Sequence, residues 1–280
     1  MSHEARDRAN GTAVHSCPAC RARRHRSFRR RSSARPPLHT VRRGNQPVTP
    51  STPSSDHRPS AQPAAVLFDL DGTLVDSERL WLDAIRARLA LDGAAVSSAQ
   101  LVEFEGLSSI EAAHALIEVG GLSARAAEVA ADLEALTIDA FADRLSWVSG
   151  AEEALGHLRG EGIRIALVTS STHRWVDAVA ESLALGAFDV VVTADDVQHT
   201  KPDPEPYLQA FDLLGIDPGT CLVFEDSEVG VRAAVAAGSR VVQVRADLRA
   251  TSGATACIPD LRPVTAAWVA SVMALEPALP

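Results

Sequence analysis

Short, almost continuously apolar runs recur along the chain from residue 64 onwards. They span residues 64–70, 163–169, 188–194, 221–226 and 240–244. Apolar runs of this length, without alternation of polar and apolar positions, are typical of strands that are covered on both faces. The pattern therefore predicts five buried strands.

Segments with helical spacing of their apolar residues separate the last four of these strands. They span residues 172–185, 204–214 and 229–237, and residues 151–159 are a further predicted helix before the second strand. Strands that alternate with helices indicate a parallel sheet with helices on both faces. We therefore predict an α/β fold with a doubly wound, Rossmann-like parallel sheet.

The first strand interrupts this alternation, because about 90 residues separate it from the second and almost none of them have a strand pattern. Residues 80–91, 109–119 and 124–145 carry Ala, Leu and Glu at helical spacing, with glycines between the segments. We interpret this stretch as an all-helical domain inserted into the sheet domain. The predicted domains are a sheet core (64–79 and 148–250), a helical cap (80–147) and a C-terminal extension that packs on the core (251–280).

Charge divides the chain near residue 63. The formal net charge of −9 conceals 13 arginines and three acids in residues 1–63, followed by 14 basic and 33 acidic residues. The first segment is rich in Arg, Ser and Pro and has no apolar periodicity, so we expect a disordered basic arm over 1–63. It would bind nucleic acid only non-specifically, and the acidic remainder is unlike a nucleic-acid-binding domain.

The absence of membrane and secretion signals and the low cysteine content lead us to expect a cytoplasmic protein. No run of apolar residues is long enough to span a membrane, and the N-terminal residues lack the apolar core of a secretory signal. Four cysteines in 280 residues are too few for a disulfide scaffold.

Lys201 is the only lysine, whereas all 26 other basic residues are arginine. A lysine retained at this one position suggests a need for a compact ammonium group.

Polar side chains gather where the predicted strands end. Ligands of open parallel sheets bind at the carboxyl ends of the strands, so we expect these residues to converge on one edge. Asp69 and Asp226 are hard oxygen ligands suited to Mg²⁺. The residues in question are Asp69 and Asp71, Thr169 and Ser170, Lys201, and Glu225 and Asp226. Hydroxyls and an ammonium beside a metal are the components of a phosphoryl-transfer site.

Four segments, at these strand ends, resemble in order and spacing the signature motifs of the haloacid dehalogenase superfamily. They are FDLDGTLVDS (68–77), VTSS (168–171), KPDPEPY (201–207) and FEDSEVGV (224–231). The resemblance extends over about residues 64–245 and is closest to members with a helical cap after the first motif, including sugar phosphatases and β-phosphoglucomutase.

The resemblance implies a role for each residue. Asp69 would be the nucleophile that forms an aspartyl-phosphate. Asp71 would act as general acid and then general base, with its backbone carbonyl on the metal. Thr169 and Ser170 would bind phosphate, and Lys201 would bridge phosphate and nucleophile. Asp226 would complete the Mg²⁺ site with Asp69 and Asp71, and Glu225 would be a further ligand or lie in the surrounding shell.

The cap residues that would contact substrate are less specific. Residues 105–113 resemble the family's substrate-reading cap loop, which makes Gly106, Ser108 and Ser109 candidate contacts. The same residues equally fit the start of a helix capped by Ser108 or Ser109. Trp81 and His114 could contact substrate, although packing is the more common role of such residues on an amphipathic helix.

Activities known in this superfamily are separated by single residues. Dehalogenases lack the second aspartate, which is present here as Asp71, and the phosphonatases need a second lysine, which this chain lacks. A β-phosphoglucomutase-like mutase is the main alternative, but the positions that align with its cationic cap residues are Trp81, Glu105 and Ser109. A non-enzymatic binding protein is a third hypothesis.

We therefore predict a Mg²⁺-dependent phosphatase that hydrolyses a small phosphomonoester, such as a sugar phosphate, through an aspartyl-phosphate. The expected partner is a small phosphorylated metabolite, and the expected assembly is a monomer or homodimer.

Overall fold

The computed structural model describes residues 62–94, 97–104, 107–121, 124–186 and 188–275. Almost all of the predicted basic arm, the final residues of the C-terminal extension, and two residues of the expected cap loop, Glu105 and Gly106, lie outside the described residues.

The described strands form one six-stranded parallel sheet with the order β3-β2-β1-β4-β5-β6. The strands are β1 (Ala65–Phe68), β2 (Arg164–Val168), β3 (Val190–Val192), β4 (Cys221–Glu225), β5 (Arg240–Val244) and β6 (Ala256–Ile258). All five predicted strands are present, and the doubly wound parallel sheet is confirmed. The sixth strand, β6, was not predicted, because its three apolar residues, two of them only partly buried, form too short a run to be recognised.

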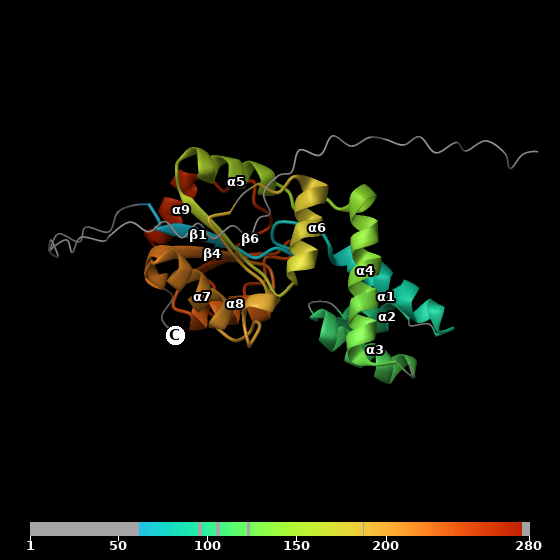
Figure 1. Cartoon of the computed structure of the whole chain (residues 1–280). Helices are drawn as coiled ribbons and strands as arrows, with labels where there is room; N and C mark the ends of the chain where they lie inside the picture. The colour runs from blue at the N-terminus through green and yellow to red at the C-terminus, as the bar shows by residue number, and fades with distance from the viewer. Residues whose placement is uncertain (1–61, 95–96, 105–106, 122–123, 187, 276–280) are drawn as a thin grey trace, which may run out of the picture. The chain divides into compact units, whose positions relative to one another are not determined.

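Strand β1 occupies the centre of the sheet, and all four of its side chains are fully buried. Val66 and Phe68 belong to one apolar cluster, and Ala65 and Leu67 to another, because successive side chains of a strand point to opposite faces. Figure 1 shows α5 (Ala151–Gly160) and α9 (Ala266–Met273) on one face of the sheet and α7 (Glu205–Leu214) and α8 (Glu228–Ala236) on the other. Burial on both faces explains why these strands are apolar throughout.

The residues between β1 and β2 form a helical insert, which we define as residues 78–144. Its helices pack mainly through α1 and α4 and through α3 and α4. They are α1 (Glu78–Leu91), α2 (Ser98–Leu101), α3 (Ser109–Gly120) and α4 (Ala126–Arg144), with a short 3-10 turn over Val102–Phe104. The three long helices were predicted, whereas the four-residue α2 was too short to produce a periodic pattern.

The two connections between the helical insert and the sheet lie side by side. The Asp76 N–H donates to the carbonyl of Ser146 at 2.9 Å, and the Val148 N–H donates to the carbonyl of Leu74 at 2.9 Å. An antiparallel bridge joins Val75 to Trp147 between them. The insert therefore leaves and rejoins the sheet at one point, beside the carboxyl end of β1.

Helix α6 (His173–Leu183) follows β2 and contacts α4 of the insert. Its first turn is capped by Thr172, whose hydroxyl accepts from the Trp175 N–H.

Among the described residues, no helix is both long and apolar enough to cross a membrane.

Candidate active site

The turn after β1 positions the two aspartates of the first motif. The Asp69 N–H donates to the carbonyl of Phe224 at 3.0 Å, which extends the β1–β4 pairing to the sheet edge. Gly72 then adopts a φ of +83°, which favours glycine. A Cβ atom on Gly72 would also lie 2.1 Å from Asp226 Oδ2. The glycine therefore permits both the turn and the approach of the β4 carboxylate.

Lys201 lies at the centre of the site, with its side chain only 3% exposed. Its Nζ donates to Asp69 Oδ1 at 2.6 Å and to the carbonyl of Val168 at 2.8 Å, and it lies 2.6 Å from Glu225 Oε1. Burial by itself lowers the pKa of the ammonium, but the charges of Asp69 and Glu225 outweigh burial and raise that pKa. The only lysine of the chain is therefore held as a cation beside Asp69.

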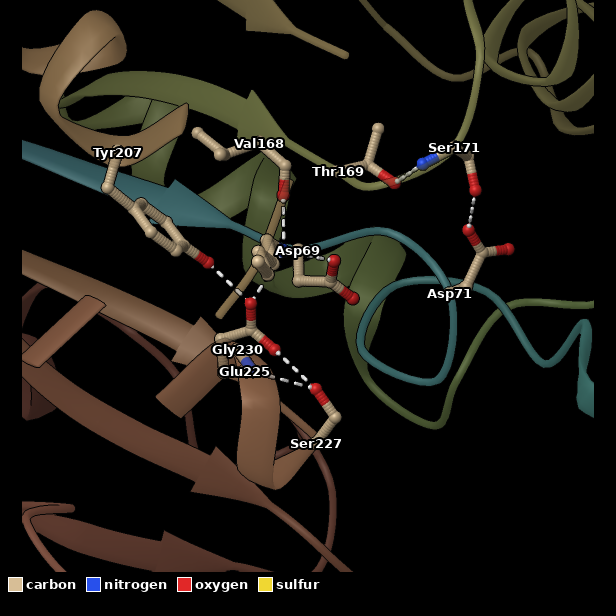
Figure 2. A network of polar contacts seen from close by, with 10 residues as sticks. Asp69, Asp71, Val168, Thr169, Ser171, Tyr207, Glu225, Ser227 and Gly230 are labelled. Atoms are coloured by element: carbon tan, nitrogen blue, oxygen red, sulfur yellow. Dashed lines mark hydrogen bonds and ion pairs between the residues drawn. The ribbon is translucent and has the colours of Figure 1, made fainter. Parts of the chain in front are cut away.

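Glu225 is fully buried and holds this lysine, and its carboxylate faces Tyr207 and Ser227 (Figure 2). The Tyr207 hydroxyl donates to Glu225 Oε1 at 2.5 Å, and the Ser227 hydroxyl donates to Oε2 at 3.4 Å. Burial raises the pKa of the Glu225 carboxyl, and the adjacent Lys201 ammonium opposes that rise. Most of the hydrogen-bonding capacity of Glu225 is thus used inside the protein, where it orients Lys201.

Asp71 accepts hydrogen bonds from three side chains. Its Oδ1 accepts from the Ser77 hydroxyl at 2.6 Å and from the Trp175 indole N–H at 2.9 Å, and its Oδ2 accepts from the Ser171 hydroxyl at 2.7 Å. Burial raises the pKa of Asp71, the charge of Asp69 raises it further, and the three donors partly oppose the rise. The carboxyl group is therefore fixed in orientation and more easily protonated than an exposed aspartate.

Thr169 and Ser170 follow β2 at the same edge and line the pocket with the aspartates. Thr169 is buried, and its hydroxyl oxygen accepts from the Ser171 N–H at 3.0 Å. The hydroxyl proton of Thr169 is left to donate, which suits a phosphate oxygen.

Asp69, Glu225 and Asp226 each place a carboxylate oxygen within 4.8 Å of the others. The Gln243 side chain on β5 donates to the backbone carbonyl of Asp226 at 2.9 Å and so holds the loop after β4. Burial, followed by the charge of Asp69, raises the pKa of Asp226 well above its usual value. Crowded hard oxygen ligands of this kind fit a divalent cation such as Mg²⁺, whose charge would relieve the repulsion.

Every residue predicted at the strand ends except Glu225 lines a pocket of about 180 Å³, to which the helical insert contributes Glu78, Trp81, Leu107, Ser108, Ser109 and Glu134. The structure thus brings together every residue that was predicted at the strand ends.

Ser108 is the N-cap residue of α3, in a capping box with Glu111. The predicted helix start is therefore confirmed. Ser108 and Ser109 also line the pocket, and their contact with substrate stays a prediction. Gly106, the third candidate of the cap loop, lies outside the described residues.

Several residues of the site had no predicted role. Ser77, Ser171 and Tyr207 lie within the quoted motifs, so their proximity to the aspartates was a usable indication. Trp175 and Gln243 produced no such indication, because each acts through a contact with a residue distant in sequence: Asp71 for Trp175 and the Asp226 carbonyl for Gln243.

The chain was compared with known proteins. The sequence model of the family of haloacid dehalogenase-like hydrolases matches residues 63–238 of this chain. Hexitol phosphatase A of Escherichia coli is 36% identical over 188 residues, which are 64% of this chain and 82% of that protein. The bifunctional riboflavin kinase/FMN phosphatase of Arabidopsis thaliana is 32% identical over 184 residues, or 65% of this chain, and the match spans only 48% of that longer protein.

A solved structure shows the same fold. CbbY from Rhodobacter sphaeroides, in complex with phosphate, superimposes with a TM-score of 0.66 over 71% of this chain and 95% of that chain, at 23% identity. The family match covers more than half of the chain, and it includes both aspartates of the first motif and Lys201. The chain therefore belongs to the haloacid dehalogenase-like hydrolases.

Proposed function

We propose that this protein is a Mg²⁺-dependent phosphatase that hydrolyses a small phosphomonoester through an aspartyl-phosphate on Asp69. The observation that carries the proposal is the placement of Asp69 at the pocket, with its carboxylate bound to the buried Lys201 ammonium and Asp71 two residues away. A nucleophile, a cation and a proton donor then face one substrate phosphate.

In the first step, a carboxylate oxygen of Asp69 attacks phosphorus, and the bond from phosphorus to the leaving-group oxygen breaks. Asp71 transfers its proton to that oxygen and releases an alcohol. The raised pKa of Asp71, caused mainly by burial, favours the protonated form that this step needs. The Lys201 ammonium offsets the negative charge of the phosphate oxygens, and the Thr169 hydroxyl donates a hydrogen bond to one of them.

In the second step, Asp71 is a carboxylate and removes a proton from a water molecule that attacks phosphorus. The bond between phosphorus and Asp69 breaks, which releases inorganic phosphate and restores the Asp69 carboxylate. Ser77, Ser171 and Trp175 hold Asp71 in one orientation through both steps.

Asp69 and Asp226, with the backbone carbonyl of Asp71, are the residues proposed to hold Mg²⁺. Bound there, the ion would supply positive charge to the transferring phosphoryl group. Glu225 lies close enough to join them, but its bonds to Lys201 and Tyr207 favour a supporting role.

Phosphate release with Mg²⁺ from a panel of phosphorylated sugars, polyols and acids tests the proposal. We expect release from at least one member, its loss on chelation of Mg²⁺, and its loss in Asp69→Asn. Asp212→Asn, an exposed change on α7, is the matched control and should retain activity. No release from any member, or full activity in Asp69→Asn, would refute the proposal. A mutase would instead isomerise a sugar phosphate with little free phosphate.

A further inference from the structure

The residues that the helical insert contributes to the pocket wall include Trp81 on α1 and Glu134 on α4. The phosphate-binding groups come from the strand ends, so these two residues are placed to meet the leaving group of the substrate. Neither has a role in the chemistry described above.

Trp81 is only 9% exposed, and its indole N–H has no hydrogen-bond partner among the described residues. Its ring packs edge-on against Trp175, with 6.2 Å between ring centroids. Most buried donors in proteins have a partner, and a donor without one lowers stability. Nε1 itself is covered by neighbouring atoms, so a ligand acceptor would reach it only through a small shift of the pocket wall. An unpaired donor in a side chain that lines the pocket nevertheless indicates such an acceptor on the molecule that binds there.

Glu134 supplies the complementary group. Its side chain is 13% exposed, Oε1 accepts from the Thr172 hydroxyl, and Oε2 lies 3.7 Å from a guanidinium nitrogen of Arg174. Arg174 is 58% exposed and does not line the pocket, so water screens much of its attraction. Glu134 is thus a fixed carboxylate that presents hydrogen-bond acceptors to the pocket.

Charge on the pocket wall is unbalanced outside the phosphate site. Among the described residues that line the pocket, Lys201 is the only cation, and it is bound to Asp69 and Glu225. The carboxylates of Glu134 and Glu78 both line the pocket, so a second anionic group on the substrate would find no cationic partner there and would be repelled. A hydroxyl group can satisfy both Trp81 and Glu134, because it accepts one hydrogen bond and donates another.

We propose that Trp81 and Glu134 form a leaving-group subsite that selects uncharged, polyhydroxylated phosphomonoesters and disfavours those with a carboxylate or a second phosphate. A substrate hydroxyl oxygen accepts from the Trp81 indole, and a substrate hydroxyl proton is donated to Glu134. This inference rests on the proposed phosphatase function and adds the two residues that set its specificity.

Two substrates that differ at one carbon test the role of charge. Glucitol 6-phosphate and 6-phosphogluconate share a six-carbon hydroxylated chain and differ in having a hydroxymethyl group or a carboxylate at C1. We expect kcat/KM to favour glucitol 6-phosphate by at least about tenfold, which corresponds to about 1.4 kcal/mol. Glu134→Gln keeps an acceptor and removes the charge, so this ratio should fall about tenfold. Asp139→Asn, an exposed change on the same helix, should leave the ratio unchanged.

Hexyl phosphate, which lacks hydroxyl groups, tests the role of Trp81. Trp81→Phe keeps a ring and removes the N–H, so kcat/KM for glucitol 6-phosphate should fall about tenfold more than that for hexyl phosphate. Thermal unfolding would show whether the variant is folded, and if it is not, Glu134→Gln decides the proposal.

The outcomes separate this inference from the phosphatase proposal. If the wild-type enzyme hydrolyses no phosphomonoester, the phosphatase function fails. If it hydrolyses 6-phosphogluconate as well as glucitol 6-phosphate, or if Glu134→Gln leaves their ratio unchanged, the subsite proposal is overturned and the phosphatase function stands. An equal loss on glucitol and hexyl phosphates in a folded Trp81→Phe variant would overturn the role given to Trp81.

Discussion

At the scale of single residues, the site depends on side chains that hold the reacting groups as much as on those groups themselves. Asp71 has three side-chain donors, and Lys201 has two carboxylate partners and a backbone carbonyl. Each contact limits the orientation of a group that must act on one phosphate. Preorganised groups of this kind contribute to catalysis because little reorganisation is needed during the reaction.

Trp175→Phe tests this view, because it removes one donor to Asp71 and keeps an aromatic ring against Phe141 and Trp81. We expect kcat to fall about tenfold or more, with KM little changed, because general acid–base catalysis contributes about 10²–10⁴-fold and needs an oriented carboxyl group. Steady-state kinetics with any substrate of the wild-type enzyme measures this.

Trp268→Phe is the matched control, because Trp268 stacks on Phe224 and does not line the pocket. Its kcat should equal that of the wild-type enzyme. A wild-type kcat in Trp175→Phe would contradict the orienting role of the indole.

At the scale of secondary-structure elements, helix α8 packs against the end of β4 through a glycine. A Cβ atom on Gly230 would lie 2.0 Å from the Glu225 carboxyl carbon, so only glycine allows the helix to approach the buried carboxylate. The Gly230 N–H also donates to the Ser227 hydroxyl at 3.1 Å, which caps the helix (Figure 2). The first turn of α8 thereby positions Glu225 and, through it, Lys201.

Gly230→Ala should consequently displace Glu225 from Lys201 and Tyr207. We expect a lower kcat and a loss of about 1–3 kcal/mol in the free energy of unfolding, the usual penalty for overpacking a buried site. Urea unfolding and phosphate release measure the two effects.

Gly156→Ala provides the control within a helix, because nothing lies within 4 Å of the Cβ position on α5. That change should leave kcat unaltered and stabilise the protein by up to about 1 kcal/mol, from helix propensity alone. Equal stability changes in the two variants would show that close packing at Gly230 is unimportant.

At the scale of the whole molecule, residues 1–63 and the remainder carry opposite net charges. Every residue with a proposed catalytic, metal-binding or phosphate-binding role lies between Asp69 and Asp226, within the part that matches the family. The predicted basic arm therefore has no assigned part in the reaction.

Deletion of residues 1–61 should leave kcat/KM for a small substrate and the thermal unfolding midpoint unchanged, and should reduce any salt-sensitive binding to DNA, because that binding depends on clustered positive charge. Phosphate release, thermal unfolding and a DNA mobility shift at two salt concentrations measure these effects. A fall in kcat/KM on deletion would show that the arm contributes to the site.

Much of the fold could be predicted from local pattern. Strands buried on both faces are apolar throughout, and amphipathic helices have a regular period, so β1 to β5 and the long helices were recognisable. β6 was not recognisable, because its three residues are not part of a longer apolar run as those of β3 are, and the four-residue α2 contains too few positions for a helical period. The residues at the carboxyl ends of the strands were also predictable, because parallel strands direct those ends to one edge.

The sequence by itself determined the sheet, the helical insert and the set of aspartates and the lysine at the strand ends, because these depend on periodicity and on motifs of adjacent residues. Only the tertiary structure decided that Trp175 donates to Asp71, that Glu225 and Tyr207 surround Lys201, and that Trp81 and Glu134 share a pocket wall. These contacts join residues from different elements, and their existence depends on how the helices pack. A linear pattern records the spacing within one element but not the distance between two.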